Sequence, residues 1–122
     1  MKKYPSAAKY VQVVLFVLLA VACGARLSQA TTPKSVVLAY DAGTQTLSVT
    51  IDHYTFSRGM HHVEYVEIKK NGVSSGKNEY STQPTDELFT YTYKIPAVKG
   101  DSFEVTATCN MWGRRTSTLT VP

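Results

Sequence analysis

The chain has 122 residues, of which 13 are basic and nine acidic, and its formal net charge is +4. Four of the basic residues and none of the acidic ones lie within the first 30 positions, so residues 31–122 carry nine residues of each sign. This neutral balance argues against nucleic acid or an anionic membrane surface as a partner, because both are recognised through clustered Lys and Arg.

The first 30 residues have the three-part pattern of a secretory signal. Three lysines within the first nine residues precede an apolar run at residues 11–23, and Ser-Gln-Ala at residues 28–30 provides the small side chains that signal peptidase reads. The apolar run is shorter than the ~20 residues that a membrane-spanning helix needs. We therefore expect an exported protein, periplasmic or extracellular, with a signal peptide at residues 1–30. A loose lipobox at residues 20–23 leaves a lipoprotein acylated at Cys23 as an alternative.

Residues 31–122 suffice for one small core and show a string of short strands without a convincing helix. Apolar residues alternate with polar ones at residues 47–52 and 89–95, which is the period of a half-buried strand. Asn71-Gly72 is a strong hairpin signal. The expected strands lie at residues 36–40, 47–52, 63–70, 73–80, 89–95, 103–109 and 116–121, the fourth being an edge strand or a loop. This spacing predicts an all-β domain, an immunoglobulin-like β-sandwich of about seven antiparallel strands.

Cysteine parity gives the first indication of chemistry. Of the two cysteines, Cys23 leaves with the signal or becomes lipidated, so Cys109 is alone in the exported domain. It cannot form an intramolecular disulfide, which leaves a buried inert thiol, an intermolecular partner or a metal ligand.

The histidines give the second indication. His53, His61 and His62 are the three histidines of the chain, and they fall within ten residues between two expected strands. Imidazole and thiolate together suit Fe, Cu and Zn. The alternative is that these histidines are ordinary loop and surface residues.

Two segments resemble a known family. Residues 61–68 (HHVEYVEI) resemble the His-His/Tyr-Ile-x-Trp-Ile stretch of the desulfoferrodoxin and superoxide reductase iron-binding domain, and residues 109–113 (CNMWG) resemble its Cys-Asn-x-His-Gly motif. His53 precedes His61 as one family histidine precedes another, although the intervening loop is longer and lacks the usual Pro. Lys34-Ser35-Val36 falls where the family has Lys-His-Val. The likeness covers nearly all of residues 31–122 in one order.

The resemblance implies a mononuclear iron site. In the family, four histidines and one cysteine bind the iron and leave one position open for superoxide. Carried over, the metal ligands are His53, His61 and Cys109, and Lys34 is the catalytic residue that steers the anion. The implied partners are superoxide or another small anion and an electron donor protein; a homo-oligomer is left open.

The implied ligand set is incomplete, because Ser35 and Trp112 stand where the third and fourth histidines should be. If the family register holds, the indole of Trp112 fills the space of an equatorial histidine and covers one flank of the site. We therefore expect an exported metal-binding redox protein with a modified or degenerate centre. The alternatives are a metal-free binding or structural module, a copper protein with Met60 or Met111 as a weak axial ligand, and a carrier resembling the sulfur-oxidation protein SoxZ, which lacks a Cys-Asn-x-x-Gly segment.

Overall fold

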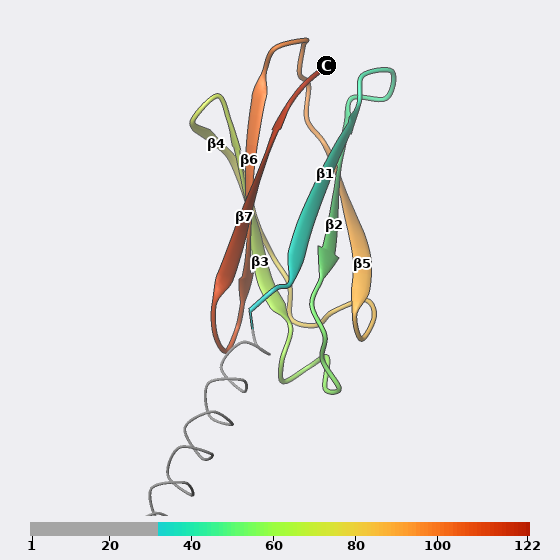
Figure 1. The fold of residues 1–122 in the computed structure, drawn as a ribbon, viewed down its shortest axis with the longest axis vertical. Helices are drawn as coiled ribbons and strands as arrows, with labels where there is room; N and C mark the ends of the chain where they lie inside the picture. Colours follow the sequence, from blue (N-terminus) through green and yellow to red (C-terminus); the bar gives the residue numbers. More distant parts are fainter. Residues whose placement is uncertain (1–31) are drawn as a thin grey trace, which may run out of the picture. The chain divides into compact units, whose positions relative to one another are not determined.

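The computed structural model describes residues 32–122, so the signal-peptide and lipobox predictions lie outside the described residues. The described part contains seven antiparallel strands in two sheets and no helix, which confirms the predicted β-sandwich (Figure 1). None of its segments is a helix of the length and apolarity needed to cross a bilayer. The strands are β1 (Ser35–Asp41), β2 (Thr46–Asp52), β3 (Val63–Lys70), β4 (Val73–Glu79), β5 (Leu88–Lys94), β6 (Ser102–Cys109) and β7 (Arg114–Thr120).

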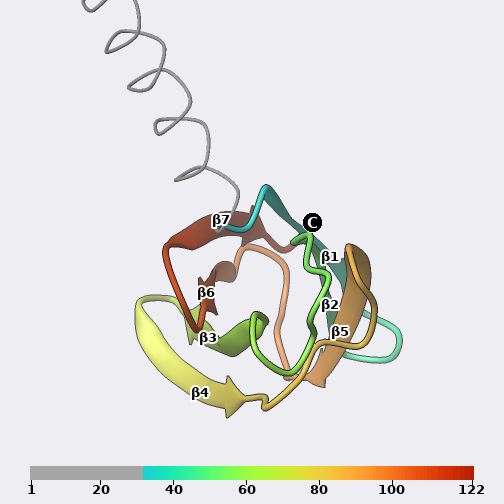
Figure 2. The same cartoon turned by 90° about the horizontal axis from the view of Figure 1, so that it is seen from below.

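The two sheets have the orders β1-β2-β5 and β4-β3-β6-β7, and they face each other as two layers (Figure 2). The chain passes from one sheet to the other between β2 and β3, between β4 and β5, and between β5 and β6. Both ends of the β2–β3 connection carry predicted site residues. The crossing therefore brings residues of one sheet close to the end of the other.

The alternating pattern places one face of each strand in the core. In β2 and β6 every second residue is buried, as the period of two requires. Phe103 is fully buried and packs its ring against Tyr40, with the ring centroids 5.5 Å apart. The core cluster consists of Val36, Leu47, Val49, Ile51, Val63, Val66, Ile68, Phe89, Phe103, Val105, Ala107 and Val121.

Tyrosines close the edge of the sandwich where β4 and β5 belong to different sheets. Tyr80, directly after β4, stacks on Tyr91 of β5 with the ring centroids 4.1 Å apart, and its hydroxyl hydrogen-bonds that of Tyr93 at 2.7 Å. Burial, followed by the proximity of Tyr80, raises the pKa of Tyr91 to about 12. The Tyr91 hydroxyl is therefore neutral at ordinary pH, and the stack adds contact between the sheets.

The last strand differs from its predicted bounds. It begins at Arg114, so the expected start at residue 116 is two residues too late, and Arg114 and Arg115 belong to the strand. The turn ends at Gly113, because this residue adopts a φ of 83° and its carbonyl accepts a hydrogen bond from the Cys109 N–H at 3.0 Å. A Cβ at Gly113 would collide with the Thr32 hydroxyl, so the first described residues pack directly on this turn.

The assignment of the core predicts how one substitution changes the free energy of unfolding. Phe103→Ala should lower the free energy of unfolding by about 3–5 kcal/mol, because it removes a fully buried aromatic ring and leaves a cavity. Urea unfolding followed by circular dichroism measures the change. The matched control is Val98→Ala, an exposed position where the change should stay within about 0.5 kcal/mol. Equal effects at the two positions would contradict the assigned core.

Candidate metal centre

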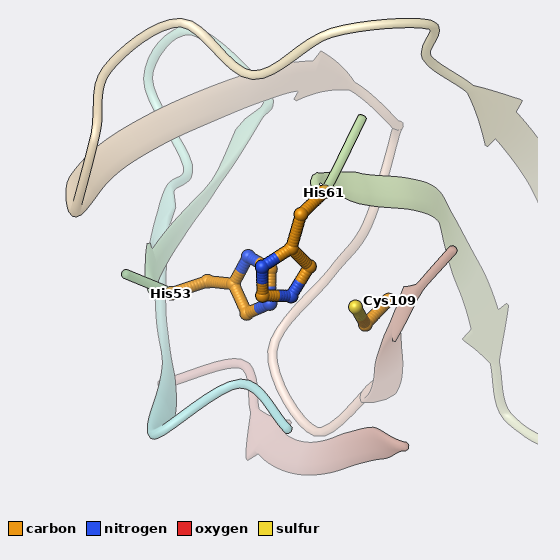
Figure 3. A group of neighbouring side chains, drawn as sticks. All are labelled: His53, His61 and Cys109. Carbon is orange, nitrogen blue, oxygen red and sulfur yellow. The ribbon is translucent and has the colours of Figure 1, made fainter. Parts of the chain in front are cut away.

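Three predicted site residues come together at one end of the sandwich. His53 follows β2, His61 lies two residues before β3, and Cys109 is the last residue of β6. One ligand atom from each can be chosen so that all lie within 4.8 Å of one another. The two imidazoles meet edge to face with their centroids 4.7 Å apart, and the Cys109 sulfur points toward them (Figure 3). Both sheets therefore contribute to one cluster, which is the arrangement that a shared ion requires.

Gln83 fixes the orientation of His53. Its Oε1 accepts a hydrogen bond from the Val63 N–H at 3.2 Å and lies 2.7 Å from His53 Nδ1, while its Nε2 donates to the carbonyls of His53 (2.7 Å) and Thr85 (3.0 Å). Because an amide N–H can only donate and carbonyls can only accept, these partners define which atom of Gln83 is the oxygen. His53 Nδ1 must then carry a proton, which leaves Nε2 as the ring nitrogen for Cys109 or for a metal that displaces the Nε2 proton.

This arrangement matches the way metal-binding histidines are normally held. A ligating imidazole donates its other N–H to a fixed acceptor, which sets the tautomer and the ring orientation. His53 is 1% exposed and Gln83 is 2% exposed, so water does not compete for the hydrogen bond between them. Of the two ring nitrogens of His53, Nε2 is therefore the one that can serve as a ligand atom.

Asn110 places the segment that carries His61. Its Oδ1 accepts from the His62 N–H at 2.9 Å, its Nδ2 donates to the Met60 carbonyl at 3.0 Å, and its own N–H donates to the His62 carbonyl at 3.0 Å. These bonds hold the backbone on both sides of His61. Since Asn110 directly follows Cys109, one residue sets the position of two candidate ligands.

The sulfur of Cys109 lies in a polar environment at the end of β6. The Met111 N–H points at Sγ with a distance of 3.5 Å. Burial by itself raises the pKa of this thiol, but hydrogen bonds from His53 and from the backbone N–H groups of Trp112 and Met111, with the charge of His53, outweigh it. The net pKa of Cys109 is lowered, and a thiolate is the form that binds metals.

Other predicted residues do not join the cluster. Lys34 is exposed, and its backbone N–H bonds the Asp52 carbonyl at 2.7 Å; its role as an anion-steering residue stays a prediction. His62 is buried but lies outside the group of possible ligands. Trp112 is 67% exposed, so the expectation that its indole covers one flank of the site is wrong. Its turn projects beyond the end of β6, and an indole there faces solvent.

Sequence reasoning missed the two positioning residues. Asn110 was part of the Cys-Asn-x-x-Gly motif, so a signal existed, but its three bonds to Met60 and His62 depend on how two distant loops meet. Gln83 lies in a polar stretch, Ser81-Thr82-Gln83-Pro84, that gave no sign of burial.

Comparisons with known proteins complete the description. No family model matches the chain, and no curated protein matches it. A solved structure to which it is similar is the superoxide reductase (neelaredoxin) from Ignicoccus hospitalis, with 14% identity, a TM-score of 0.47, and coverage of 73% of this chain and 80% of that chain. A similarity this weak assigns no role to any residue, so the ligands are read from the side chains of this chain.

The lowered pKa of Cys109 predicts its reactivity. Alkylation of metal-free protein by iodoacetamide, followed by mass spectrometry of the Cys109 peptide, should show a pH midpoint below that of the same peptide in urea-unfolded protein. His53→Ala should move the midpoint upward, because a hydrogen bond to the thiolate is lost.

The same pKa shift affects stability. Because the folded-state pKa is depressed, the thiolate contributes stability that is present above the unfolded pKa of about 8.5 and is lost as pH falls through the lowered value. Cys109→Ser should remove this pH dependence. A folded midpoint at or above the unfolded one would contradict the described surroundings of the sulfur.

The tautomer of His53 is a separate prediction. Nitrogen-15 spectra of metal-free protein should show His53 protonated at Nδ1, because Gln83 Oε1 can only accept. Gln83→Leu removes the acceptor and should yield a mixture of tautomers, whereas Gln83→Glu keeps an acceptor and should preserve the Nδ1-protonated form. An unchanged tautomer in Gln83→Leu would show that Gln83 does not set it.

Proposed function

We propose that this chain is an exported metal-binding redox protein that holds one iron ion on His53, His61 and Cys109. The observation that carries the proposal is the meeting of two imidazoles and one thiolate, with ligand atoms within 4.8 Å of one another. Imidazole and thiolate donors suit iron, copper and zinc and disfavour magnesium and calcium. The prepared tautomer of His53 and the lowered pKa of Cys109 support the same assignment.

The donor set fits a three-ligand centre and does not fit the complete iron centre of the family that the sequence resembles. The chain has three histidines, and His62 lies outside the cluster. Two of the four equatorial nitrogens are therefore missing. A metal held by three side chains keeps positions open for small molecules, as catalytic sites do. The proposed centre is accordingly a modified one, and we also propose a reaction for it.

The proposed reaction is the one-electron reduction of a small oxygen-derived anion such as superoxide. Iron, when bound, would supply the one-electron chemistry. The reduction of superoxide to hydrogen peroxide consumes one electron and two protons, so the protein would require an electron donor protein. The chain itself would hold His53 through Gln83, hold His61 through Asn110, and stabilise the Cys109 thiolate through the Met111 N–H. Lys34, which is exposed, would attract the anion.

Copper is the second candidate metal, because two histidines and one cysteine are also the donors of copper electron-transfer sites. Such sites add a weak axial ligand. Met60 adjoins His61 and Met111 lies two residues after Cys109, although both side chains are mostly exposed, at 77% and 59%.

Export belongs to the same proposal. Cleavage after Ala30 would leave Cys109 as the one cysteine of the released domain. A thiol without a cysteine partner in an oxidising compartment is protected when it is buried, and Cys109 is 5% exposed. Metal binding would give it a further protection.

Metal analysis tests the proposal. After anaerobic incubation with Fe²⁺, and separately with Cu⁺ and Zn²⁺, wild-type protein should retain one ion per chain. His53→Ala, His61→Ala and Cys109→Ser should each lower affinity by more than the roughly 10–100-fold that loss of a ligand's hydrogen-bond partner costs. The oxidised iron form should show a thiolate-to-iron absorption band that is absent in Cys109→Ser.

His62→Ala is the matched control, since it removes a neighbouring imidazole outside the cluster. It should retain the metal and the absorption band. Circular dichroism verifies that every variant is folded. Wild-type protein that retains none of the three metals would reject the metal centre and favour a metal-free binding module. Retention of copper in preference to iron, with an intense visible band, would replace the iron assignment by the copper one.

A further inference from the structure

Large apolar side chains are exposed on the loops that surround the cluster. Tyr54, Phe56 and Met60 lie between β2 and β3, and Met111 and Trp112 lie between β6 and β7. Their exposed fractions run from 58% for Tyr54 to 90% for Phe56. We call these five residues the apolar rim. Exposed apolar residues gathered in one place mark an interaction surface, whereas scattered ones need no explanation.

The two loops of the apolar rim are joined to each other at Met60 and His62. Asn110 bonds the backbone at Met60 and at His62, so the β6–β7 turn is attached to the β2–β3 loop. The β2–β3 loop is also bonded to the segment before β5, because the N–H groups of His53 and Thr55 donate to the carbonyls of Glu87 and Asp86. These hydrogen bonds fix the conformation of both loops in the absence of a partner.

The chain enters the domain beside this rim. Thr32, the first described residue, touches Gly113, which directly follows Trp112. In Figure 1 β1 starts at the end of the sandwich where the β2–β3 and β6–β7 connections lie, and the C-terminus is at the other end. The apolar run at residues 11–23 ends nine residues before Thr32, a distance of at most about 30 Å in extended chain.

We propose that the apolar rim docks on a lipid bilayer surface, with Phe56, Met60 and Trp112 inserted among the headgroups. In the lipoprotein alternative, acylation of Cys23, nine residues before Thr32, would keep the chain at a membrane on the side of the domain that carries the rim. In the signal-peptide reading the released domain has no such tether, and the rim by itself would bind the lipid. Trp and Tyr favour the membrane interface, where an amphipathic ring meets both apolar and polar surroundings.

The charges indicate which lipid surface fits. Arg58 pairs with Asp86 at 3.0 Å, and residues 31–122 are formally neutral, but Arg114 and Arg115 lie close after Trp112 and are exposed. Docking is therefore driven by apolar insertion, and the two arginines add attraction to anionic lipid. Binding should occur on zwitterionic vesicles, and the additional binding to anionic vesicles should weaken as salt is added.

Trp112 is the single tryptophan of the chain and reports on the rim directly. The experiment uses the chain expressed with its own N-terminal segment, in the processed form that accumulates, without metal. On titration with phosphatidylcholine vesicles, Trp112 emission should shift to shorter wavelength and should be quenched by lipids brominated on their acyl chains. Phe56→Ser should raise the lipid concentration needed for a half-maximal shift by roughly 10–100-fold, from the loss of one buried aromatic side chain.

The control is Val98→Ser, which removes an exposed apolar side chain at the far end of the sandwich and should leave the titration unchanged. Cys109→Ser should also leave it unchanged, so docking is tested independently of the metal centre. Emission that does not respond to vesicles would overturn the proposal. A shift that occurs without lipid and grows with protein concentration would also overturn it and would assign the rim to contact with a second copy.

Discussion

The side chain of Gln83 joins the two sheets at the end where the candidate ligands meet. It is buried and bonds four backbone or side-chain groups: the ring and carbonyl of His53 beyond β2, the Val63 N–H at the start of β3, and the Thr85 carbonyl. Both N–H groups of its Nε2 donate hydrogen bonds, and its Oε1 accepts two. Loss of such a residue would leave several buried polar groups without partners, at a cost of about 1–3 kcal/mol each. The position of His53 relative to the other sheet depends on this one amide.

A sandwich end is a suitable place for the cluster because strands of both sheets finish there. The core side chains of β2 and β6 fix these strands, and this packing also fixes His53, which follows β2, and Cys109, which is the last residue of β6. His61 lies on a loop and is instead fixed through Asn110. Gln83 and Asn110 therefore fix side-chain positions by hydrogen bonds at the ends of the strands, as apolar packing does within the strands.

The proposed metal centre and the proposed membrane surface occupy the same end of the domain. The Asn110 bonds that hold the loop carrying His61 also hold Met60 next to the β6–β7 turn. An ion bound at the cluster would thus lie close to the proposed lipid surface. The two proposals remain physically separable, because the candidate ligands are buried or half-buried, whereas the rim side chains are exposed.

The sequence by itself determined the all-β architecture, because the period of two and the turn residues are local properties that each segment expresses alone. It also determined which residue types were available for a metal: three histidines and one cysteine in residues 31–122. Only the tertiary structure decided how these are used. The burial of Gln83, the exposure of Trp112 and the start of β7 at Arg114 depend on contacts between segments distant in the chain. Such contacts leave no period or motif in the sequence, since they are set by how the two sheets pack and how their connecting loops meet.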